Sequence, residues 1–434
     1  MCYNVKNKLW KGKEKMEVNY ILNLIDERKQ ELFELLSSFI KINSESFATH
    51  GNEENMAKEL YAICQELGLK TEMYSPLDIE NIENHPDYMP GRNLENRYNV
   101  TAVFEGDENI DELMLMGHTD TVEIGDRANW KFDPLSGEIK DGKILGRGAC
   151  DDKYALAATL FIIKLLKEEG FKPKKNLVFA AYSDEEYGGS HGALAAVLKN
   201  PCNKIVNLDG RKDQIWHCGS GGMEVKYTFH ADKPIDSSKA TAKAMNVVFE
   251  VMEQFDRNRY EELEANRFYK GTCIPKTSNR YIGVRAGHNG LDLGVGELHF
   301  VFYTDKTKEE ITAEFKVLEE ILKERLAPLG FIGGSFKPNT RFFHYVFCEP
   351  DSEDIKTLIE SSKEAIGIEP LVCGSCLSDL SVISKYGNSS AFAYGAGSEF
   401  ATDGGPHQPN EYIKCEDLLE FTKTIATYVL KVLG

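Results

Sequence analysis

Residues 152–209, DKYALAATLFIIKLLKEEGFKPKKNLVFAAYSDEEYGGSHGALAAVLKNPCNKIVNLD, decide the fold. Within them, DKYALAATLFIIKLLKEEG (152–170) and GSHGALAAVLK (189–199) are predicted helices. NLVFAAYS (176–183) and KIVNLD (204–209) are apolar runs of strand length. Strands that alternate with helices in this way predict a mostly parallel sheet with helices on both faces.

Segments with strand and helix patterns continue on both sides of residues 152–209. VTAVFEG (100–106) and LMLMG (113–117) are further apolar runs of strand length, and residues 17–65 repeat apolar positions with helical spacing. Near the end of the chain, AFAYGAG (391–397) predicts a strand and CEDLLEFTKTIATYVLKVL (415–433) a closing helix. These segments extend one α/β unit over both ends of the chain.

Between them the pattern changes near Trp216. The elements predicted there, in chain order, are the strand MEVKYTFHA (223–231), the helix SSKATAKAMNVVFEVMEQF (237–255), the strands RYIGVRAG (280–287) and ELHFVFYTD (297–305), and the helix KEEITAEFKVLEEILKERLAPLG (308–330). This β-α-β-β-α order is typical of a ferredoxin-like open-faced sandwich.

The predicted fold class is therefore α/β, with an α+β domain inserted into it. Residues 16–215 and 342–434 form the mostly parallel-sheet domain, and residues 216–341 form the insert. Residues 1–15 are basic without the apolar region of a secretory signal, so we expect an N-terminal extension, with a docking arm as the alternative.

Composition excludes several classes of function. The formal net charge of −18 disfavours binding to nucleic acid or to an anionic membrane. No run reaches the roughly 18 apolar residues that a membrane-spanning helix needs. The 10 cysteines are irregularly spaced, which indicates reduced, mostly buried thiols and a cytoplasmic protein. The pair Cys373 and Cys376 is weak evidence for a metal or redox site, and buried thiols are the favoured interpretation.

Acidic residues and histidines cluster at five places beside the predicted strands and helices. The clusters are Gly117-His118-Thr119-Asp120, Asp151-Asp152, Asp184-Glu185-Glu186, Asp209 and His407. In open parallel sheets, functional groups gather at the carboxyl ends of the strands. We therefore expect the five segments to meet at one edge of the sheet.

Each cluster alone could be a helix cap or a solvated loop. Several acids at one apolar edge would repel one another unless cations were present. Two divalent cations would remove that repulsion. Nitrogen from two histidines together with carboxylate oxygen suits zinc, with cobalt or manganese as alternatives.

Five segments carry a resemblance to a known family: GHTDTV (117–122), WKFDPLSGEIKDGKILGRGACDDK (130–153), SDEEYGG (183–189), NLDG (207–210) and PHQPNEY (406–412). Together they resemble the co-catalytic zinc amidohydrolases that include succinyl-diaminopimelate desuccinylase, acetylornithine deacetylase, aminoacylase and glutamate carboxypeptidase. The resemblance covers about 17–215 and 342–434, and HPDYMPGRNLENRYNVTAVFEG (85–106) resembles the deacylase branch.

The resemblance implies cleavage of an amide bond in a small acyl-amino acid or short peptide, by a deacylase, dipeptidase or carboxypeptidase. It implies a dinuclear centre with the ligands His118, Asp151, Glu186, Asp209 and His407. In this family Asp151 would bridge both ions, its peptide bond to Asp152 is often cis, and Asp209 would complete the His118 side.

Two further roles follow from the same resemblance. Asp120 would orient His118 through the far ring nitrogen. Glu185 would act as general base, because it precedes a metal-binding glutamate and can take a proton from the attacking water. The insert is expected to act as a lid or dimerisation domain, with hinges near residues 216 and 341.

The insert departs from the family pattern, which usually has a histidine in a short turn after its first strand. His230 is the candidate equivalent, with His217 and His288 as alternatives. Arg285 could clamp a substrate carboxylate or be an exposed arginine.

Other segments are less specific. Ser378 and Asp379 are candidates for substrate contact, with a helix cap as the alternative. The glycine-rich segments 219–222 and 394–406 match no phosphate-binding motif and are expected to be flexible loops.

Two rival functions need comparison with the hydrolase. A non-catalytic binding or regulatory module would keep the fold without the chemistry, but the base and all five ligand positions are present. A mononuclear metalloprotease would need an H-E-x-x-H helix, which the sequence lacks. A homodimer formed through the insert is a further expectation from the resemblance.

Overall fold

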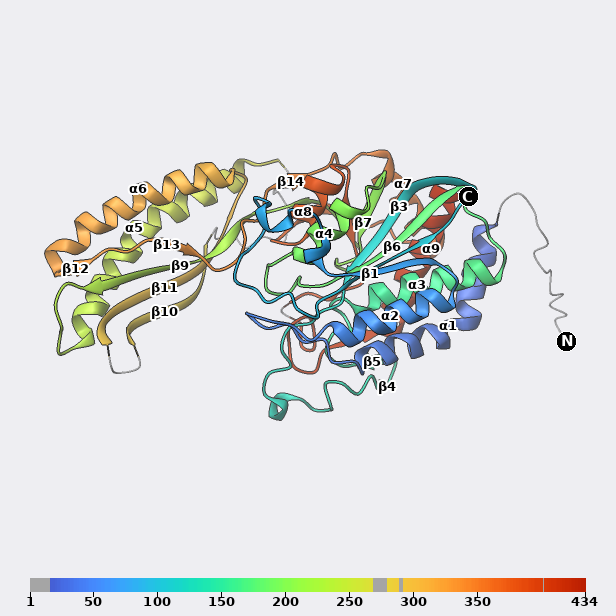
Figure 1. The fold of residues 1–434 in the computed structure, drawn as a ribbon, viewed down its shortest axis with the longest axis horizontal. Helices are drawn as coiled ribbons and strands as arrows, with labels where there is room; N and C mark the ends of the chain where they lie inside the picture. Colours follow the sequence, from blue (N-terminus) through green and yellow to red (C-terminus); the bar gives the residue numbers. More distant parts are fainter. Residues whose placement is uncertain (1–15, 268–278, 289–291, 401) are drawn as a thin grey trace.

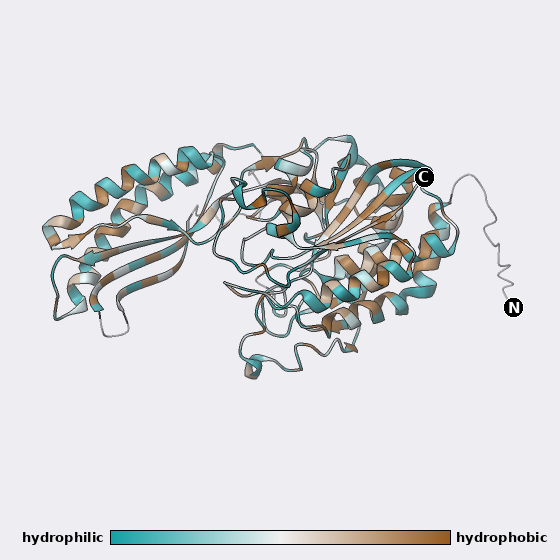
Figure 2. Cartoon of the chain, viewed as in Figure 1, coloured by the Kyte–Doolittle hydropathy of each residue, from teal (hydrophilic) through white to brown (hydrophobic). Residues whose placement is uncertain are grey.

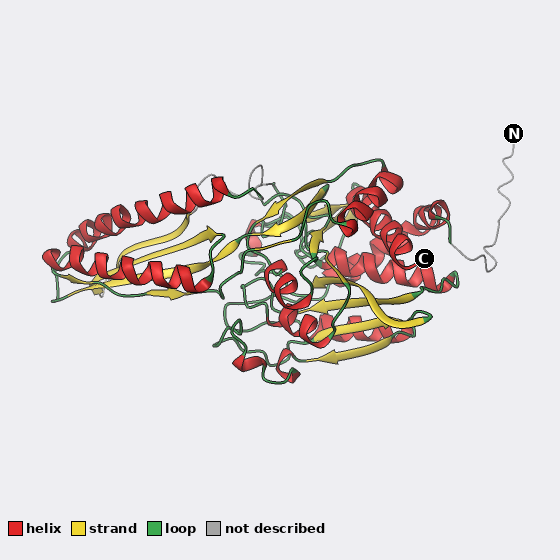
Figure 3. Ribbon diagram, turned by 90° about the horizontal axis from the view of Figure 1, so that it is seen from above, coloured by secondary structure: helices red, strands yellow, loops and turns green. Residues whose placement is uncertain are grey.

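The computed structural model describes residues 16–267, 279–288, 292–400 and 402–434. It has an elongated shape with two parts (Figure 1). The larger part contains both ends of the described chain, and the smaller part extends away from it with two long helices (Figure 3). Among the helices built from these residues, none combines the length and the apolar character needed to cross a membrane.

The larger part is built on a nine-stranded sheet. The strand order is β1, β2, β6, β3, β7, β16, β8 and β14, and β15 pairs with β8. The strands are β1 (Lys70–Tyr74), β2 (Asn99–Phe104), β3 (Glu108–His118), β6 (Lys175–Tyr182), β7 (Lys204–Asn207), β8 (Gln214–Gly219), β14 (Val346–Phe347), β15 (Leu371–Ser375) and β16 (Phe392–Tyr394). The centre, β6-β3-β7-β16, is parallel, and antiparallel strands flank it.

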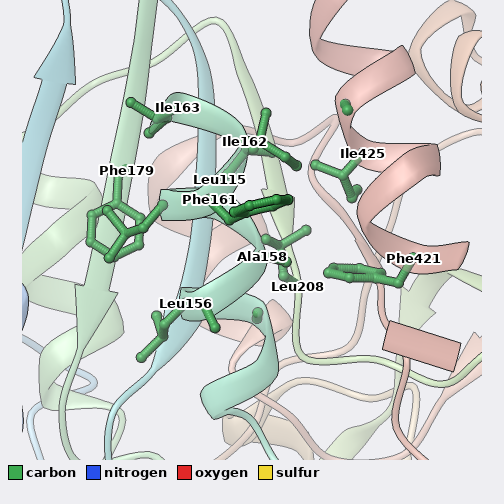
Figure 4. Packing of buried hydrophobic residues seen from close by; sticks show 14 of the residues in the cluster. Leu115, Leu156, Ala158, Phe161, Ile162, Ile163, Phe179, Leu208, Phe421 and Ile425 are labelled. Carbon is green, nitrogen blue, oxygen red and sulfur yellow. The ribbon is translucent and has the colours of Figure 1, made fainter. Parts of the chain in front are cut away.

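The central strands are apolar at consecutive positions because both faces of the sheet are covered. In β3, Leu113 and Leu115 face one core, while Met114 and Met116 face a second core on the opposite side. Figure 2 shows these strands as hydrophobic along most of their length. On the first face, Phe161 and Phe421 pack together with Leu115 (Figure 4).

Helices cover the two faces unequally. The first face carries α1 (Val18–Ile40), α2 (Glu54–Glu66), α3 (Lys153–Glu168), α7 (Glu353–Ile366) and α9 (Cys415–Leu433). The second face carries α4 (His191–Lys199), the short α8 (Leu380–Val382) and the π-helical turn η5 (Ile383–Gly387).

Smaller elements connect these layers. A three-stranded sheet pairs β4 (Ile139–Lys140), β5 (Lys143–Leu145) and β17 (Tyr412–Lys414). Four 3-10 turns are η1 (Pro76–Asp78), η2 (Ile82–Asn84), η3 (Arg127–Asn129) and η4 (Ala327–Leu329).

The smaller part is an open-faced sandwich. Its sheet contains β9 (Gly221–Ala231), β10 (Asn279–His288), β11 (Asp292–Thr304), β12 (Phe331–Ile332) and β13 (Phe336–Pro338). One face packs on α5 (Ser238–Ala265) and α6 (Lys308–Leu326), with alternate residues such as Tyr227 and Phe300 in a common core. The predicted fold class, an α/β domain with an inserted ferredoxin-like sandwich, is confirmed.

The chain changes sheets slightly later than predicted. Trp216 lies in β8, which pairs with β15 and β16 of the large sheet, and β9 of the small sheet starts at Gly221. Residues 219–222 are buried strand ends and not the expected flexible loop. Strands β8 and β15 were absent from the predicted elements. We propose that the insert runs from about Gly221 to residue 341.

Candidate metal centre

Two groups of donor atoms meet at one edge of the large sheet. His118, Asp151 and Asp209 form one group, and Asp151, Glu186 and His407 form the other. Within each group, one ligand atom from every residue lies within 4.8 Å of the others. Asp151 belongs to both groups. The structure therefore brings together all five residues that the sequence suggested as metal ligands.

The topology explains why these residues meet. His118 is the last residue of β3, Glu186 follows β6, and Asp209 follows β7. These three strands are parallel neighbours, so their carboxyl ends lie at the same edge. Asp151 precedes α3 and is joined to Asp152 by a cis peptide, as the resemblance implies.

The distances place Asp151 between the two histidines. Its Oδ1 lies 3.0 Å from His118 Nε2, and its Oδ2 lies 3.1 Å from His407 Nε2. Glu186 Oε2 lies 2.8 Å from the same nitrogen of His407. One carboxylate thus presents one oxygen to each histidine, which is the arrangement that a bridging ligand requires.

The electrostatics of the cluster favour bound cations. Burial, followed by the charge of Asp151, raises the pKa of Asp209 to about 7. Burial alone would lower the pKa of His407, but the charge of Glu186 and the hydrogen bond to Asp151 raise it to about 11. Carboxylates and imidazoles this close to one another need positive charge between them. The donor set therefore fits two divalent cations.

Asp120 acts differently from the expectation. His118 Nδ1 lies 2.9 Å from the main-chain oxygen of Asp120 and 3.7 Å from its carboxylate. The carboxylate instead accepts hydrogen bonds from the main-chain N–H of Glu185 at 3.1 Å and of Glu186 at 3.2 Å. Asp120 therefore fixes both the ring of His118 and the segment that carries Glu185.

A buried ion network behind this segment was not predicted. Arg97 is fully buried, and its Nε donates to Glu53 at 2.8 Å. Its Nη1 lies 2.6 Å from Asp184, and its Nη2 lies 3.7 Å from Asp120. Arg92 also pairs with Asp184. Both arginines occur in residues 85–106, which the sequence marked as family-like, but nothing there indicated their partners.

A second buried ion pair joins two of the loops that carry donors. Arg147 Nη1 donates to Glu411 Oε2 at 2.6 Å, and the main-chain N–H of Cys150 donates to Glu411 Oε1 at 3.0 Å. Asp151 directly follows Cys150, and Glu411 lies in the same loop as His407. The pair therefore sets the position of the shared carboxylate relative to the second histidine.

We predict that Glu411→Gln lowers zinc affinity about 10- to 100-fold, as changes behind metal ligands do. The amide still accepts from Cys150 but leaves Arg147 buried without its counter-charge. Competition with a chromogenic chelator measures the affinity. The matched control is Glu416→Gln, an exposed position in the first turn of α9, which should retain normal affinity. Equal zinc affinity in both variants would contradict the positioning role.

A cavity of about 540 Å³ opens over the donor cluster. Its wall includes Glu185, Glu186, Asp151, Asp209 and His407, together with residues from the insert. Ser378 also lines it, and the buried Ser378 Oγ has no hydrogen-bond partner in the described part of the chain.

Asp379 is buried behind the cavity wall. It accepts a hydrogen bond from Ser190 and lies 3.5 Å from Arg341 Nη2. It precedes α8 but makes no side-chain cap there. Of the two candidates for substrate contact, Ser378 therefore reaches the cavity and Asp379 does not.

The described candidates for the family histidine and for the carboxylate clamp do not reach the cavity. His230 is exposed near the far end of β9, and Arg285 is exposed on β10 opposite Glu297. His217 is buried in β8, and its Nδ1 bonds to the main-chain oxygen of Cys348 at 2.8 Å. His288 ends β10, and its side chain lies outside the described residues. None of these four side chains is among the described residues of the cavity wall.

The two neighbouring cysteines form no site of their own. Neither Cys373 nor Cys376 forms a disulfide with a described residue, and Cys373 is buried in β15, where its Sγ lies 3.7 Å from Gln214 Oε1. Burial raises the pKa of Cys376 to about 11, so its thiol stays protonated near neutral pH. The interpretation as buried thiols agrees with this environment.

Comparison with known proteins agrees with this geometry. A family model described as peptidase family M20/M25/M40 matches residues 114–431. An uncharacterised metallohydrolase of Methanocaldococcus jannaschii is 25% identical over 443 residues, which cover 91% of this chain and 97% of that protein. Succinyl-diaminopimelate desuccinylase of Wigglesworthia glossinidia brevipalpis is 28% identical over 354 residues, which cover 74% and 83%. Among solved structures, the dipeptidase Dug1p of Saccharomyces cerevisiae has a TM-score of 0.71 at 16% identity, covering 95% of this chain and 98% of that one.

The matched region contains every donor of the cluster, from His118 to His407. The prediction of a metal-dependent amide hydrolase is confirmed at the level of the family. By sequence match, fold and donor geometry together, the chain belongs to peptidase family M20/M25/M40.

Proposed function

We propose that this protein is a dizinc amidohydrolase that cleaves an N-acyl-amino acid or a short peptide. In this proposal Asp151 would be shared by two cations. His118 and Asp209 would hold one cation, and Glu186 and His407 would hold the other. The observation that carries the proposal is that Asp151 faces His118 with one carboxylate oxygen and His407 with the other. One imidazole per cation favours zinc over magnesium or calcium, with cobalt or manganese as alternatives.

A pair of divalent cations would supply Lewis acidity here, which polarises a substrate carbonyl and makes water a stronger acid. Glu185 is the proposed general base. It lines the cavity next to Glu186, and the carboxylate of Asp120 holds its main-chain N–H. Burial, followed by the charge of Asp379, raises the pKa of the Glu185 carboxyl well above its usual range. A carboxylate with a raised pKa can take a proton from water and return it to the leaving nitrogen.

The remaining proposed roles concern substrate. Ser378 lies on the cavity wall, its hydroxyl has no hydrogen-bond partner among the described residues, and it would contact the substrate directly. Asp379 would not contact the substrate and would instead position the side chains of Arg341 and Ser190. A panel of N-acyl-amino acids and dipeptides, tested with zinc- and cobalt-loaded protein, examines the function. Bound metal without hydrolysis of any member would favour the alternative of a non-catalytic binding or regulatory module.

We predict that zinc affinity is coupled to pH through Asp209. Because its folded-state pKa is raised to about 7, the metal-free protein holds a proton there that the unfolded chain releases at lower pH. This group therefore destabilises the metal-free fold less as pH falls through about 7, and zinc must displace the proton. The rise in melting temperature caused by zinc should be larger at roughly pH 8 than at roughly pH 6.

Differential scanning fluorimetry with and without chelator measures this rise in melting temperature. Calorimetry in two buffers of different ionisation enthalpy should also detect more protons released on zinc binding at roughly pH 6 than at roughly pH 8. His407, with a pKa of about 11, would lose its proton at both pH values and does not account for the difference. A rise in melting temperature and a proton release that are the same at both pH values would contradict the coupling.

We also propose a homodimer formed through the insert. Strand β10 lies at the edge of the small sheet, and Ile282 and Val284 on it are 44% and 54% exposed. An exposed apolar edge strand is a ready surface for pairing with another strand. Val284→Lys should shift the protein towards monomer in sedimentation velocity, whereas Lys226→Ala in β9 should not. A wild-type protein that sediments as a monomer would refute the dimer.

The proposed location is a reducing compartment, the cytoplasm. The cysteines in the described ranges form no disulfide with one another, and several of them are buried in the core. Such usage is typical of proteins that are not exposed to oxidising conditions.

A further inference from the structure

The cavity wall opposite the metal centre contains an acidic residue of the insert. Glu224 and Val301 are register partners on β9 and β11, and both line the cavity. Their neighbours Val225 and Phe300 point the other way, into the core beneath α5 and α6. Because side chains alternate along a strand, Glu224 and Val301 share the open face of the small sheet. That face therefore forms part of the substrate site.

The carboxylate of Glu224 is held in place by its surroundings. Its Oε1 lies 2.5 Å from His299 Nε2 and also accepts a hydrogen bond from the Asn339 side chain. The main chain is fixed as well, since Glu224 N–H donates to Thr340 Oγ1 at 3.1 Å and its carbonyl accepts from Asn339 N–H at 2.8 Å. Glu224 is thus a pre-organised acidic group, outside the metal centre, on the wall of the same cavity.

The cavity offers little to a negatively charged ligand group beyond the metals. Arg92 is the only arginine or lysine among the described residues that line it. Its side chain is 3% exposed, and it is occupied by Asp184 and by the main-chain oxygen of Ala48. The expected carboxylate clamp, Arg285, lies elsewhere on β10. Among the described residues of the wall, a second carboxylate on the acyl group of a substrate would therefore meet Glu224 and no free arginine or lysine.

We infer that Glu224 binds a protonated amine of the substrate, so that the enzyme prefers substrates that carry an ammonium group over substrates whose acyl group ends in a carboxylate. The inference rests on the proposed amide hydrolysis and assigns its substrate class. An ammonium group donates charge-assisted hydrogen bonds to a carboxylate, and such bonds are stronger than those between neutral groups. The amine lies on the acyl side or on the leaving side, and matched probes separate the two.

Three probes differ only at the end of the acyl chain: 3-aminopropanoyl-L-leucine, butanoyl-L-leucine and succinyl-L-leucine. They present an ammonium, a methyl and a carboxylate group. Nα-acetyl-L-lysine and N-acetyl-L-2-aminoheptanoic acid test the leaving side in the same way, because a methyl group replaces the ammonium group at the same position. With zinc-loaded protein, kcat/KM should be about 10- to 100-fold higher for the ammonium member of one pair than for its neutral partner. The succinyl compound should be the poorest of its set.

Glu224→Gln should remove most of that preference while hydrolysis of the neutral probe stays within about twofold, because the amide can still bond to Asn339 and His299. Glu297→Gln is the matched control, since Glu297 lies in the same sheet but outside the cavity wall. A wild-type enzyme without preference for either ammonium probe, or a preference that survives in Glu224→Gln, would overturn the inference.

A binding measurement separates this inference from the proposed function. Calorimetry of the ammonium and neutral probes with zinc-loaded Glu185→Gln requires no turnover. Tighter binding of an ammonium probe, lost when Glu224→Gln is added, would support the amine site even if no probe were hydrolysed. Hydrolysis of the probes without any such difference would leave the proposed function intact and refute the amine site.

Discussion

Glu185→Gln will lower kcat by about 10²- to 10⁴-fold, the range that a positioned general base contributes. Zinc content will stay close to that of the wild type. We expect kcat to fall without loss of zinc because Glu185 belongs to neither donor group, whereas its neighbour Glu186 lies 2.8 Å from His407. Glutamine keeps the shape of the side chain and the main-chain hydrogen bond to Asp120, but it cannot take a proton from water.

The measurement combines steady-state kinetics with metal analysis of the same purified sample. Glu186→Gln is the informative comparison, because it removes a donor and should reduce bound zinc as well as activity. If Glu185→Gln loses zinc to the same extent as Glu186→Gln, Glu185 serves the metal centre and not proton transfer. If Glu185→Gln retains more than about a tenth of the wild-type rate, proton transfer by this residue is refuted.

Three donors, His118, Glu186 and Asp209, could be predicted from the local pattern because they lie at or just beyond the ends of apolar strands, whereas His407 lies in a loop and was indicated by the family resemblance. Strands β3 and β6 are apolar on both faces, so their ends are visible in the sequence, and His118 and Glu186 lie at or just beyond those ends. Parallel pairing then requires these ends to share an edge. The position of Asp209 follows in the same way from β7.

Other parts of the fold carry weaker local signals. Strand β8, QIWHCG, mixes polar and apolar residues because it pairs with β16 and β15 at the margin of the sheet. Its pattern resembles that of β9, the alternating strand that follows it, so the sequence predicts that Trp216 belongs to the insert. Only the pairing partners, which lie far along the chain, show that it belongs to the large sheet.

The contacts that individual side chains make are the least predictable feature of the structure. The sequence suggests that Asp120 supports His118, but it cannot show that the main-chain oxygen makes the contact and the carboxylate holds Glu185. Alternation places Glu224 on a polar strand face, yet whether that face meets solvent or the cavity depends on how the insert docks. Arg285 is a candidate by residue type, but in the folded chain it lies exposed on β10.

The buried arginine behind the metal centre will have the largest effect on stability. Arg97→Met should lower the free energy of unfolding by about 3–5 kcal/mol, since removing one partner of a buried ion pair leaves the others uncompensated. Arg97 contacts Glu53 and Asp184 directly and lies near Asp120, and burial already raises the pKa of Glu53 to about 7. Without the guanidinium, Glu53 must protonate or the surrounding loops must move.

Urea unfolding of the metal-free protein measures this loss without interference from zinc binding. Arg127→Met is the matched control, because the Arg127–Asp133 pair is 58% and 61% exposed and such pairs contribute about 0–1 kcal/mol. The loss of unfolding free energy in Arg97→Lys should lie between the losses in Arg97→Met and Arg127→Met. One ammonium group cannot replace the planar guanidinium that contacts Glu53 and Asp184 together. A loss in Arg97→Met no larger than that in Arg127→Met would mean that the acids relax into water.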